Sequence, residues 1–172
     1  MGNALPRNNN VTRAGFEDNK TVFGAILRGE LPADILYEDE RVLCFRDIKP
    51  MTEHHILVIP KQHIEHPASV VSDDVPLLRH METVALDTLQ AQYPAIDARA
   101  AHAAGTASMG YHRWPFLTVW HLHLHCIYPM PISWSKPMAR TLSFREGGPF
   151  YAPSAAIIAH AEATAPSSGS RL

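Results

Sequence analysis

The pattern His-Leu-His-Leu-His at residues 121–125 concentrates more reactive side chains than any other stretch of this chain. Successive side chains of a β-strand point to opposite faces, so a strand here places the imidazoles of His121, His123 and His125 on one exposed face. Imidazole acts as nucleophile, acid, base or metal ligand near neutral pH. The row therefore predicts a site for an anion or a metal ion. The intervening side chains are expected to point into the core: Trp120, Leu122, Leu124 and Cys126.

Three interpretations of this row imply different chemistry. A histidine-rich surface strand needs no ligand, but the strict alternation over an apolar back face disfavours it. A zinc site commonly uses three imidazoles. Metal-bound histidines, however, usually donate their second N–H to a carboxylate or a carbonyl, and no Asp or Glu stands beside the row. Phosphoryl chemistry fits best, because a neutral imidazole attacks phosphorus while its neighbours bind non-bridging oxygens or supply protons.

The segments around the histidines predict an α+β domain with a mostly antiparallel sheet, one long helix and two shorter ones. Apolar residues at three- and four-residue spacing predict the long helix over residues 75–92, with core packing as the main use of its stripe. A short helix is expected to begin after Thr21 and to end near Gly29, and a loop is expected over the small residues 95–106. The remaining predicted elements are strands at 35–38, 42–47, 55–60, 109–112 and 119–127, and a last helix near 152–163.

Length and composition indicate one domain with flexible ends. We expect a disordered arm at residues 1–18, the domain at 19–130, an extension with a packed terminal helix at 131–163, and a flexible tail at 164–172. A net charge of -2 and a pI near 6.6 make nucleic-acid binding an unfavoured function. No apolar run reaches the roughly 18 residues of a membrane span. Cys44 and Cys126 are expected as buried thiols in a reducing compartment, the cytoplasm or alternatively the nucleus.

The stretch from His121 to Ile127 resembles the signature of the histidine triad family, which is His-x-His-x-His followed by two apolar residues. Residues 22–32 resemble the opening helix of that family, residues 45–50 its nucleotide-edge turn, and residues 54–63 its central strand. Within the Hint branch, residues 109–116 are similar to the third Hint subtype and more loosely to aprataxin. Gly110 stands where ordinary Hint proteins have Asn. The resemblance covers roughly residues 20–130 and implies a histidine triad fold.

The resemblance implies a role for each matching residue. His123 is the nucleophile that becomes nucleotidylated, His121 and His125 orient it and bind phosphate oxygens, and Thr118 helps to protonate the leaving group. Asp47 accepts hydrogen bonds from the ribose hydroxyls, a favourable arrangement for a carboxylate. The nucleotide-binding set is Phe23, Ile26, Phe45, Arg46, Asp47, Ile48 and His55. No metal or other cofactor is implied.

These roles imply hydrolysis of a purine nucleoside 5′-monophosphate joined to an amine or an acyl group. Alternatives are aprataxin-like removal of AMP from DNA ends, dinucleoside polyphosphate hydrolysis, a regulatory nucleotide-binding protein with little turnover, and a metal-binding module. The resemblance also implies a homodimer, with helix 75–92 near the two-fold axis and an edge strand at the contact. The competing expectation is a monomer in which the segment after Pro131 folds over that edge.

Overall fold

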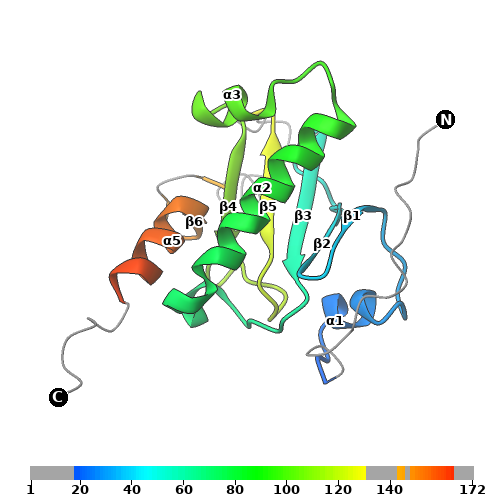
Figure 1. Cartoon of the computed structure of the whole chain (residues 1–172), viewed down its shortest axis with the longest axis vertical. Coiled ribbons are helices and arrows are strands. Elements are labelled where there is room, and N and C mark those ends of the chain that lie inside the picture. The colour runs from blue at the N-terminus through cyan, green and yellow to red at the C-terminus, as the bar shows by residue number, and fades with distance from the viewer. Residues whose placement is uncertain (1–17, 131–142, 146–147, 165–172) are drawn as a thin grey trace.

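A six-stranded sheet crossed on one face by a long helix forms the body of the protein (Figure 1). The computed structural model describes residues 18–130, 143–145 and 148–164. Every neighbouring pair of strands is antiparallel, and the order across the sheet is β1-β2-β3-β5-β4-β6. The predicted α+β class with a mostly antiparallel sheet is confirmed. None of the described helices is long and apolar enough to cross a membrane.

The strands are β1 (Ile35–Glu38), β2 (Val42–Arg46), β3 (His54–Pro60), β4 (Ser108–His112), β5 (Leu124–Tyr128) and β6 (Tyr151–Pro153). The helices are α1 (Val22–Leu27), α2 (Val75–Gln92), α3 (Ala98–Ala103) and α5 (Ser154–Ala163), with short 3-10 turns at Pro67–Ser69 and Ser72–Asp74. Four stretches lie outside the described residues: residues 1–17 of the predicted arm 1–18, residues 131–142 and 146–147 of the predicted extension, and residues 165–172 of the predicted tail 164–172.

Helix α1 begins and ends where its sequence signals place it. The hydroxyl of Thr21 accepts a hydrogen bond from the Gly24 N–H at 3.2 Å, the usual use of a threonine N-cap. Gly29 has a φ of 76°, a conformation that favours glycine and stops the helix. The prediction of a short helix ending near this glycine is therefore confirmed.

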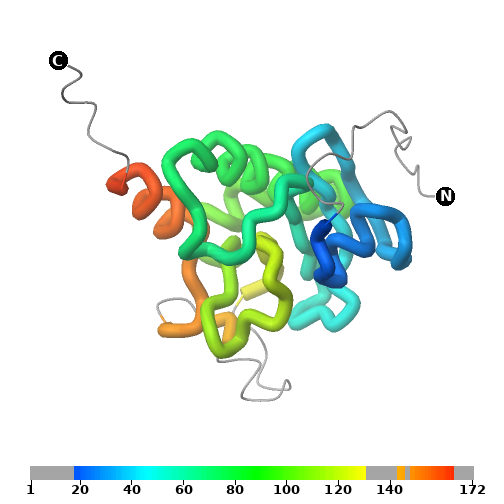
Figure 2. The backbone as a smooth tube through the Cα atoms, turned by 90° about the horizontal axis from the view of Figure 1, so that it is seen from below, coloured from blue at the N-terminus to red at the C-terminus, as the bar shows by residue number. Residues whose placement is uncertain are grey.

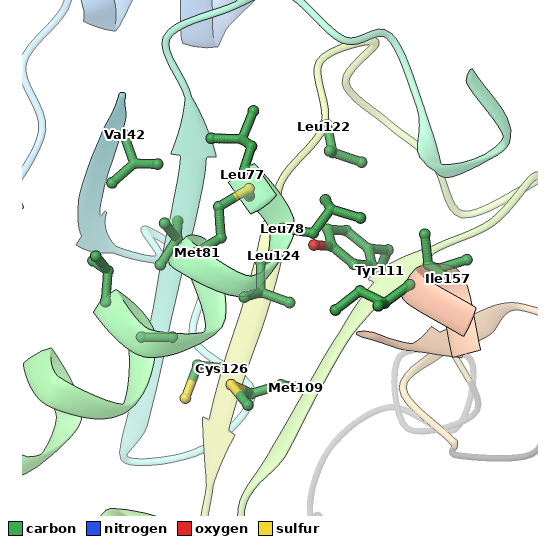
Figure 3. Close-up of a cluster of buried hydrophobic side chains, with 14 of the residues drawn as sticks. Val42, Leu77, Leu78, Met81, Met109, Tyr111, Leu122, Leu124, Cys126 and Ile157 are labelled. Atoms are coloured by element: carbon green, nitrogen blue, oxygen red, sulfur yellow. The ribbon is translucent and has the colours of Figure 1, made fainter. Parts of the chain in front are cut away.

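Helix α2 covers one face of the sheet with its apolar stripe (Figure 3). Leu78, Met81 and Leu89 are fully buried, and they pack with strand residues that share this face. Those strand residues include Val42, Val58, Met109, Leu124 and Cys126. Core packing, the main use expected of the stripe, is thus confirmed.

The opposite face of the sheet carries two smaller apolar clusters. Near α1, Phe23 and Leu27 pack on Leu43, Phe45, Leu57 and Ile59. Beside β4 and β6, Met51, Ile127, Phe144 and Tyr151 form the second cluster. Strand residues between these clusters include His55 and His125, whose neighbours along each strand face α2. The candidate site therefore lies on the face that α2 leaves uncovered.

The end of the described chain closes one edge of the sheet. β6 pairs with β4, with Tyr111 opposite Ala152 and His112 opposite Tyr151. α5 lies against α2, and an ion pair joins Arg79 to Glu162 at 2.7 Å. The helices at the two ends of the described chain, α1 (blue) and α5 (red), lie on opposite sides of the body (Figure 2). The edge that β4 would otherwise expose is therefore occupied by the same chain.

Two predicted elements were wrong. Residues 95–106 contain helix α3, which begins after Asp97, whose carboxylate accepts a hydrogen bond from the Ala100 N–H at 2.9 Å. The small residues taken as loop-forming are mostly alanines, which favour helix. The strand expected over 119–127 begins only at Leu124, because the Leu122 N–H donates to the carbonyl of Ile64 at 2.6 Å instead of to a neighbouring strand. Trp120, expected in the core, is 52% exposed.

Candidate active site

A cavity of about 1210 Å³ opens on the sheet face opposite α2. Its walls come from α1, the end of β2 and the turn after it, the ends of β4 and β5, the loop before the triad, and residues 143–144. The predicted site residues that line it are Phe23, Ile26, Phe45, Arg46, Asp47, Ile48, Thr118, His123 and His125. The structure thus brings most of the predicted set to one cavity.

The three triad histidines are buried, which differs from the exposed face expected of them. His121, His123 and His125 are 0%, 5% and 4% exposed. Alternation along the chain predicts the side to which a residue points, but not what covers that side. Here α1 and the segment around Phe144, both distant in sequence, cover the imidazoles.

His123 has one unprotonated ring nitrogen, whose lone pair is available to a ligand in the cavity. Its Nδ1 lies 2.7 Å from the carbonyl oxygen of His121, which only accepts hydrogen bonds, so Nδ1 carries the proton. Nε2 is then the basic nitrogen. The ring of Phe23 contacts the imidazole edge-on, with centroids 5.1 Å apart. Burial lowers the pKa of His123 below 6.5, which keeps the ring neutral at pH 7. A neutral, oriented imidazole is what nucleophilic attack requires.

His125 presents a proton to the same cavity. The Met51 N–H donates to Nδ1 of His55 at 3.1 Å, so the proton of His55 sits on Nε2. That Nε2–H donates to Nδ1 of His125 at 2.9 Å, and the proton of neutral His125 therefore lies on its Nε2. This buried Nε2 has no hydrogen-bond partner among the described residues. Burial lowers the pKa of His125 well below 6.5, with added effects from its histidine neighbours.

His121 does not reach the cavity with its ring. Its Nε2 donates to the carbonyl oxygen of Pro60 at 2.8 Å, and its Nδ1 accepts from the side-chain amide of Asn19 at 2.5 Å. Burial lowers the pKa of His121 to about 4. Both nitrogens are used within the protein, so His121 acts on the site through its backbone carbonyl, which orients His123.

Asn19 is a residue that sequence reasoning missed. It is 3% exposed, and its side-chain oxygen accepts from the Thr21 N–H at 3.0 Å while its amide holds His121. The backbone oxygen of Asn19 accepts from Arg28 at 2.7 Å. No pattern in the sequence distinguishes this asparagine from the asparagines before it, because the contact spans 102 positions.

Asp47 lies between the turn after β2 and the histidines. Its Oδ1 accepts from the Lys49 N–H at 2.7 Å, so this carboxylate does hold its turn. Its Oδ2 lies 3.4 Å from Nε2 of His55. Because a carboxylate accepts several hydrogen bonds, the side chain retains acceptor capacity toward the cavity that it lines.

Three members of the predicted nucleotide set sit differently from the rest. His55 is buried and does not line the cavity, but holds His125. Ile48 is 93% exposed and lies at the cavity mouth, so it does not form an enclosed wall. The guanidinium of Arg46 pairs with Asp34 at 2.9 Å, donates to Gln92 at 2.9 Å and contacts Tyr93. These contacts direct its charge toward the end of α2. Thr118 is exposed and lines the cavity.

His112 is the third histidine that lines the cavity, together with His123 and His125. It lies at the end of β4, with its ring centroid 4.5 Å from that of His125. Burial, followed by the charges of His123 and His55, lowers its pKa to about 3. Its Nε2 is buried and has no hydrogen-bond partner in the described part of the chain. The only sequence signal was its position in the loop leading to the triad.

Among the described residues, two groups of side chains are close enough to hold a metal ion. One is His112, His123 and His125, and the other is Asp47, His55 and His125, with ligand atoms within 4.8 Å in each group. Metal binding requires a lone pair on each ligating nitrogen. His125 uses its Nδ1 lone pair to accept from His55 and carries its proton on Nε2. The hydrogen-bond network therefore favours a donor toward a phosphate oxygen over a metal ligand.

The chain is similar to known proteins over most of its length. Residues 20–138 match the family model described as "Scavenger mRNA decapping enzyme C-term binding". The chain is 40% identical over 113 residues to the zebrafish (Danio rerio) adenosine 5′-monophosphoramidase HINT3. This alignment covers 65% of this chain and 66% of that protein. It is 35% identical over 130 residues to the Arabidopsis thaliana bifunctional adenosine 5′-phosphosulfate phosphorylase/adenylylsulfatase HINT4. That alignment covers 74% of this chain and 80% of the relative.

Solved structures share the fold. A histidine triad protein from Clostridium difficile superposes with a TM-score of 0.54 at 25% identity, covering 68% of this chain and 96% of that one. A HIT family hydrolase from Clostridium thermocellum superposes with a TM-score of 0.52 at 26% identity, and the match covers 70% of this chain and 97% of that one. In both comparisons nearly all of the solved chain is matched, so about three tenths of this chain has no counterpart there.

Proposed function

Since this chain belongs to the histidine triad family, we propose that it hydrolyses a nucleoside 5′-monophosphate joined to a leaving group, through a nucleotidyl-histidine intermediate. The observation that carries the proposal is the pairing of two tautomers in one cavity. His123 offers a lone pair on Nε2, and His125 offers a proton on Nε2 beside it. A nucleophile next to a hydrogen-bond donor suits attack on a phosphate.

The reaction has two displacements at the same phosphorus. In the first, Nε2 of His123 bonds to the α-phosphorus while the bond to the leaving group breaks, and Thr118 supplies a proton to that group. His123 then carries a positive charge, and its Nδ1–H stays on the carbonyl of His121. In the second, water attacks the phosphorus, returns a proton to the Thr118 oxygen, and releases the monophosphate and neutral His123. Nε2–H of His125 stabilises charge on a non-bridging oxygen in both steps.

Nucleotide binding is assigned to the α1 side of the cavity. Phe23, Ile26 and Phe45 line an apolar slot that suits a purine base, with Ile48 at its mouth. Asp47 accepts from the ribose hydroxyls next to this slot. Fixing base and ribose holds the phosphorus near His123 and lowers the entropic part of the barrier.

The relatives suggest which leaving groups to try. The zebrafish relative is named a monophosphoramidase, which favours AMP joined to an amine. The Arabidopsis relative is named an adenylylsulfatase, which makes sulfate a second candidate leaving group. Acyl-adenylates belong to the same chemical class as both.

The proposal is tested by turnover and by capture of the intermediate. Purified protein is given a fluorogenic AMP-amine, adenosine 5′-phosphosulfate, a dinucleoside polyphosphate and 5′-adenylated DNA, each with and without a chelator. We expect hydrolysis of the AMP-amine with no effect of chelator, and an acid-labile AMP adduct on His123 in a rapidly quenched sample. Binding of AMP without turnover of any substrate contradicts the proposal and favours a regulatory nucleotide-binding protein.

The homodimer is a separate proposal, which no contact in the structure tests. Within the described residues β6 pairs with β4 at one edge of the sheet, whereas β1 forms the other edge. α5 lies against α2, but Thr83 and Asp87 of α2 stay exposed. Light scattering at micromolar concentration distinguishes the two states. A mass near 19.1 kDa supports the monomer, and twice that mass supports the dimer.

A further inference from the structure

One wall of the cavity comes from a part of the chain that lies beyond the family match. The match ends at residue 138, whereas Ser143 and Phe144 line the cavity. Both are 4% exposed. The site therefore includes a contribution that is specific to the sequence after the shared domain.

The ring of Phe144 contacts three histidines of the site. Its centroid lies 4.3 Å from that of His112, 5.0 Å from that of His125 and 5.4 Å from that of His55. The contacts with His125 and His55 are edge-on, with interplanar angles of 84° and 89°. Edge-on ring pairs of this kind are favourable and restrict ring rotation. One side chain thus packs against the hydrogen-bonded pair His55–His125 and against His112.

β6 holds Phe144 in this position. Tyr151 packs on Phe144 with centroids 5.7 Å apart, and it lies opposite His112 in the β4–β6 pairing. The Arg113 N–H also donates to the carbonyl of Phe150 at 2.7 Å. Gly110 permits this pairing, because a Cβ there would lie 2.5 Å from the Ala152 oxygen and 2.7 Å from the Tyr151 ring. The glycine that stands where ordinary Hint proteins have Asn therefore makes room for the added strand.

We propose that Phe144 is a positioning residue of this site: it fixes the rings of His125 and His112 and keeps water away from their cavity-facing nitrogens. The inference rests on the proposed hydrolysis, because it assigns the function of those nitrogens. When water is excluded, the Nε2–H of His125 donates to a phosphate oxygen without competition from solvent, and this hydrogen bond is stronger than it would be in water.

Removal of the ring has a predictable electrostatic consequence. His125 is faced by His55 from β3, by His123 before β5, by His112 from β4 and by Asp47 after β2. Apart from Asp47 these groups are histidines, and burial is the largest cause of the lowered pKa of His125. Water admitted in place of the Phe144 ring stabilises the protonated form, so the pKa of His125 and of His112 rises. A second proton on His125 goes to Nδ1 and breaks the hydrogen bond from His55 that orients the ring, so the acid limb of kcat/KM moves to higher pH.

The test compares Phe144→Ala with Phe144→Leu and with Phe150→Ala in the full chain. Histidine ring titrations by NMR and the pH profile of kcat/KM are recorded for each. We expect Phe144→Ala to raise the midpoints of His125 and His112 and to shift the acid limb upward by about one pH unit. Phe144→Leu should show little of this shift, because its side chain refills most of the space and excludes water. Phe150→Ala should leave the midpoints unchanged, since its ring packs on Phe116.

Two results would overturn the inference. One is unchanged histidine midpoints in folded Phe144→Ala, and the other is a loss of kcat/KM that is equal at every pH. If Phe144→Ala does not fold, Phe144→Val, which opens less space, is measured in the same way and decides the matter. The NMR titration needs no turnover, so failure of the proposed hydrolysis and failure of the role of Phe144 are recorded separately.

Discussion

The two faces of the sheet are built from the same strands and serve different ends. On β5, Leu124 and Cys126 lie under α2, whereas His125 and Ile127 lie on the other face. On β3, Ile56 and Val58 face α2, whereas His55 and Leu57 face away. The α2 face is one continuous apolar cluster (Figure 3), and the other face is two small clusters with imidazoles between them.

This difference shows how a small domain can bury several histidines. Burying a polar ring without a partner costs roughly 1–3 kcal/mol. On the histidine face most ring nitrogens are matched to a specific partner, such as the Pro60 carbonyl for His121. The nitrogens left for a ligand, on His112, His123 and His125, line the cavity. The continuous apolar face opposite supplies the stability that such a site lacks.

The two faces can be distinguished by substitutions, and His123→Asn on the histidine face is expected to have the largest effect on turnover. The variant keeps a polar side chain but has no imidazole nitrogen to attack phosphorus, so turnover should fall by about a thousandfold or more while AMP binding persists. Turnover and calorimetry on the same sample measure both quantities. His160→Asn, on the exposed side of α5, is the control. Turnover of His123→Asn within tenfold of the wild type would rule it out as the nucleophile.

The complementary change on the other face is Leu78→Ala. Leu78 is fully buried under α2, and its truncation should lower the free energy of unfolding by about 2–5 kcal/mol. The kcat and KM of the folded fraction should stay close to those of the wild type. Denaturant unfolding and assays well below the midpoint measure these effects. Thr83→Ala on the exposed side of α2 should change stability by less than about 0.5 kcal/mol. A large change in KM for Leu78→Ala would show that the two faces are coupled.

A smaller effect is expected at the edge of the histidine face, from Asp47→Ala. Loss of hydrogen bonds to a charged group should weaken AMP binding by about 1.5–3 kcal/mol, and the difference should vanish with a 2′,3′-dideoxy ligand. Calorimetry with both ligands measures it. Asp47→Asn is the matched control, because its amide oxygen can still accept from the Lys49 N–H. An equal loss for both ligands means that Asp47 acts only by holding its turn.

The sequence predicted those elements whose signals are local. Thr21 and Gly29 bracket α1, and the apolar spacing of Leu78, Met81 and Leu89 marks α2. The resemblance carried over the residues of the cavity as a set, and the structure brings most of that set together.

Features that depend on distant contacts could not be predicted in this way. The burial of the triad depends on Phe23 and Phe144, and the orientation of His121 depends on Asn19. Each of these contacts joins positions far apart in the chain, so no periodicity records it. The loss of regular pairing before Leu124 has the same origin, since it depends on the carbonyl of Ile64.

The alternation along β5 also limits how this sequence can change during evolution. A shift of register by one residue would exchange His125 with Leu124 or Cys126 and send each to the wrong face. A deletion or insertion between residues 121 and 127 therefore removes the core and the reactive imidazoles together. A substitution in this segment affects the side chain on one face of the sheet, whereas a change of length displaces the side chains of both faces. We expect lineages descended from such a chain to vary in the residues of this segment and to keep its length.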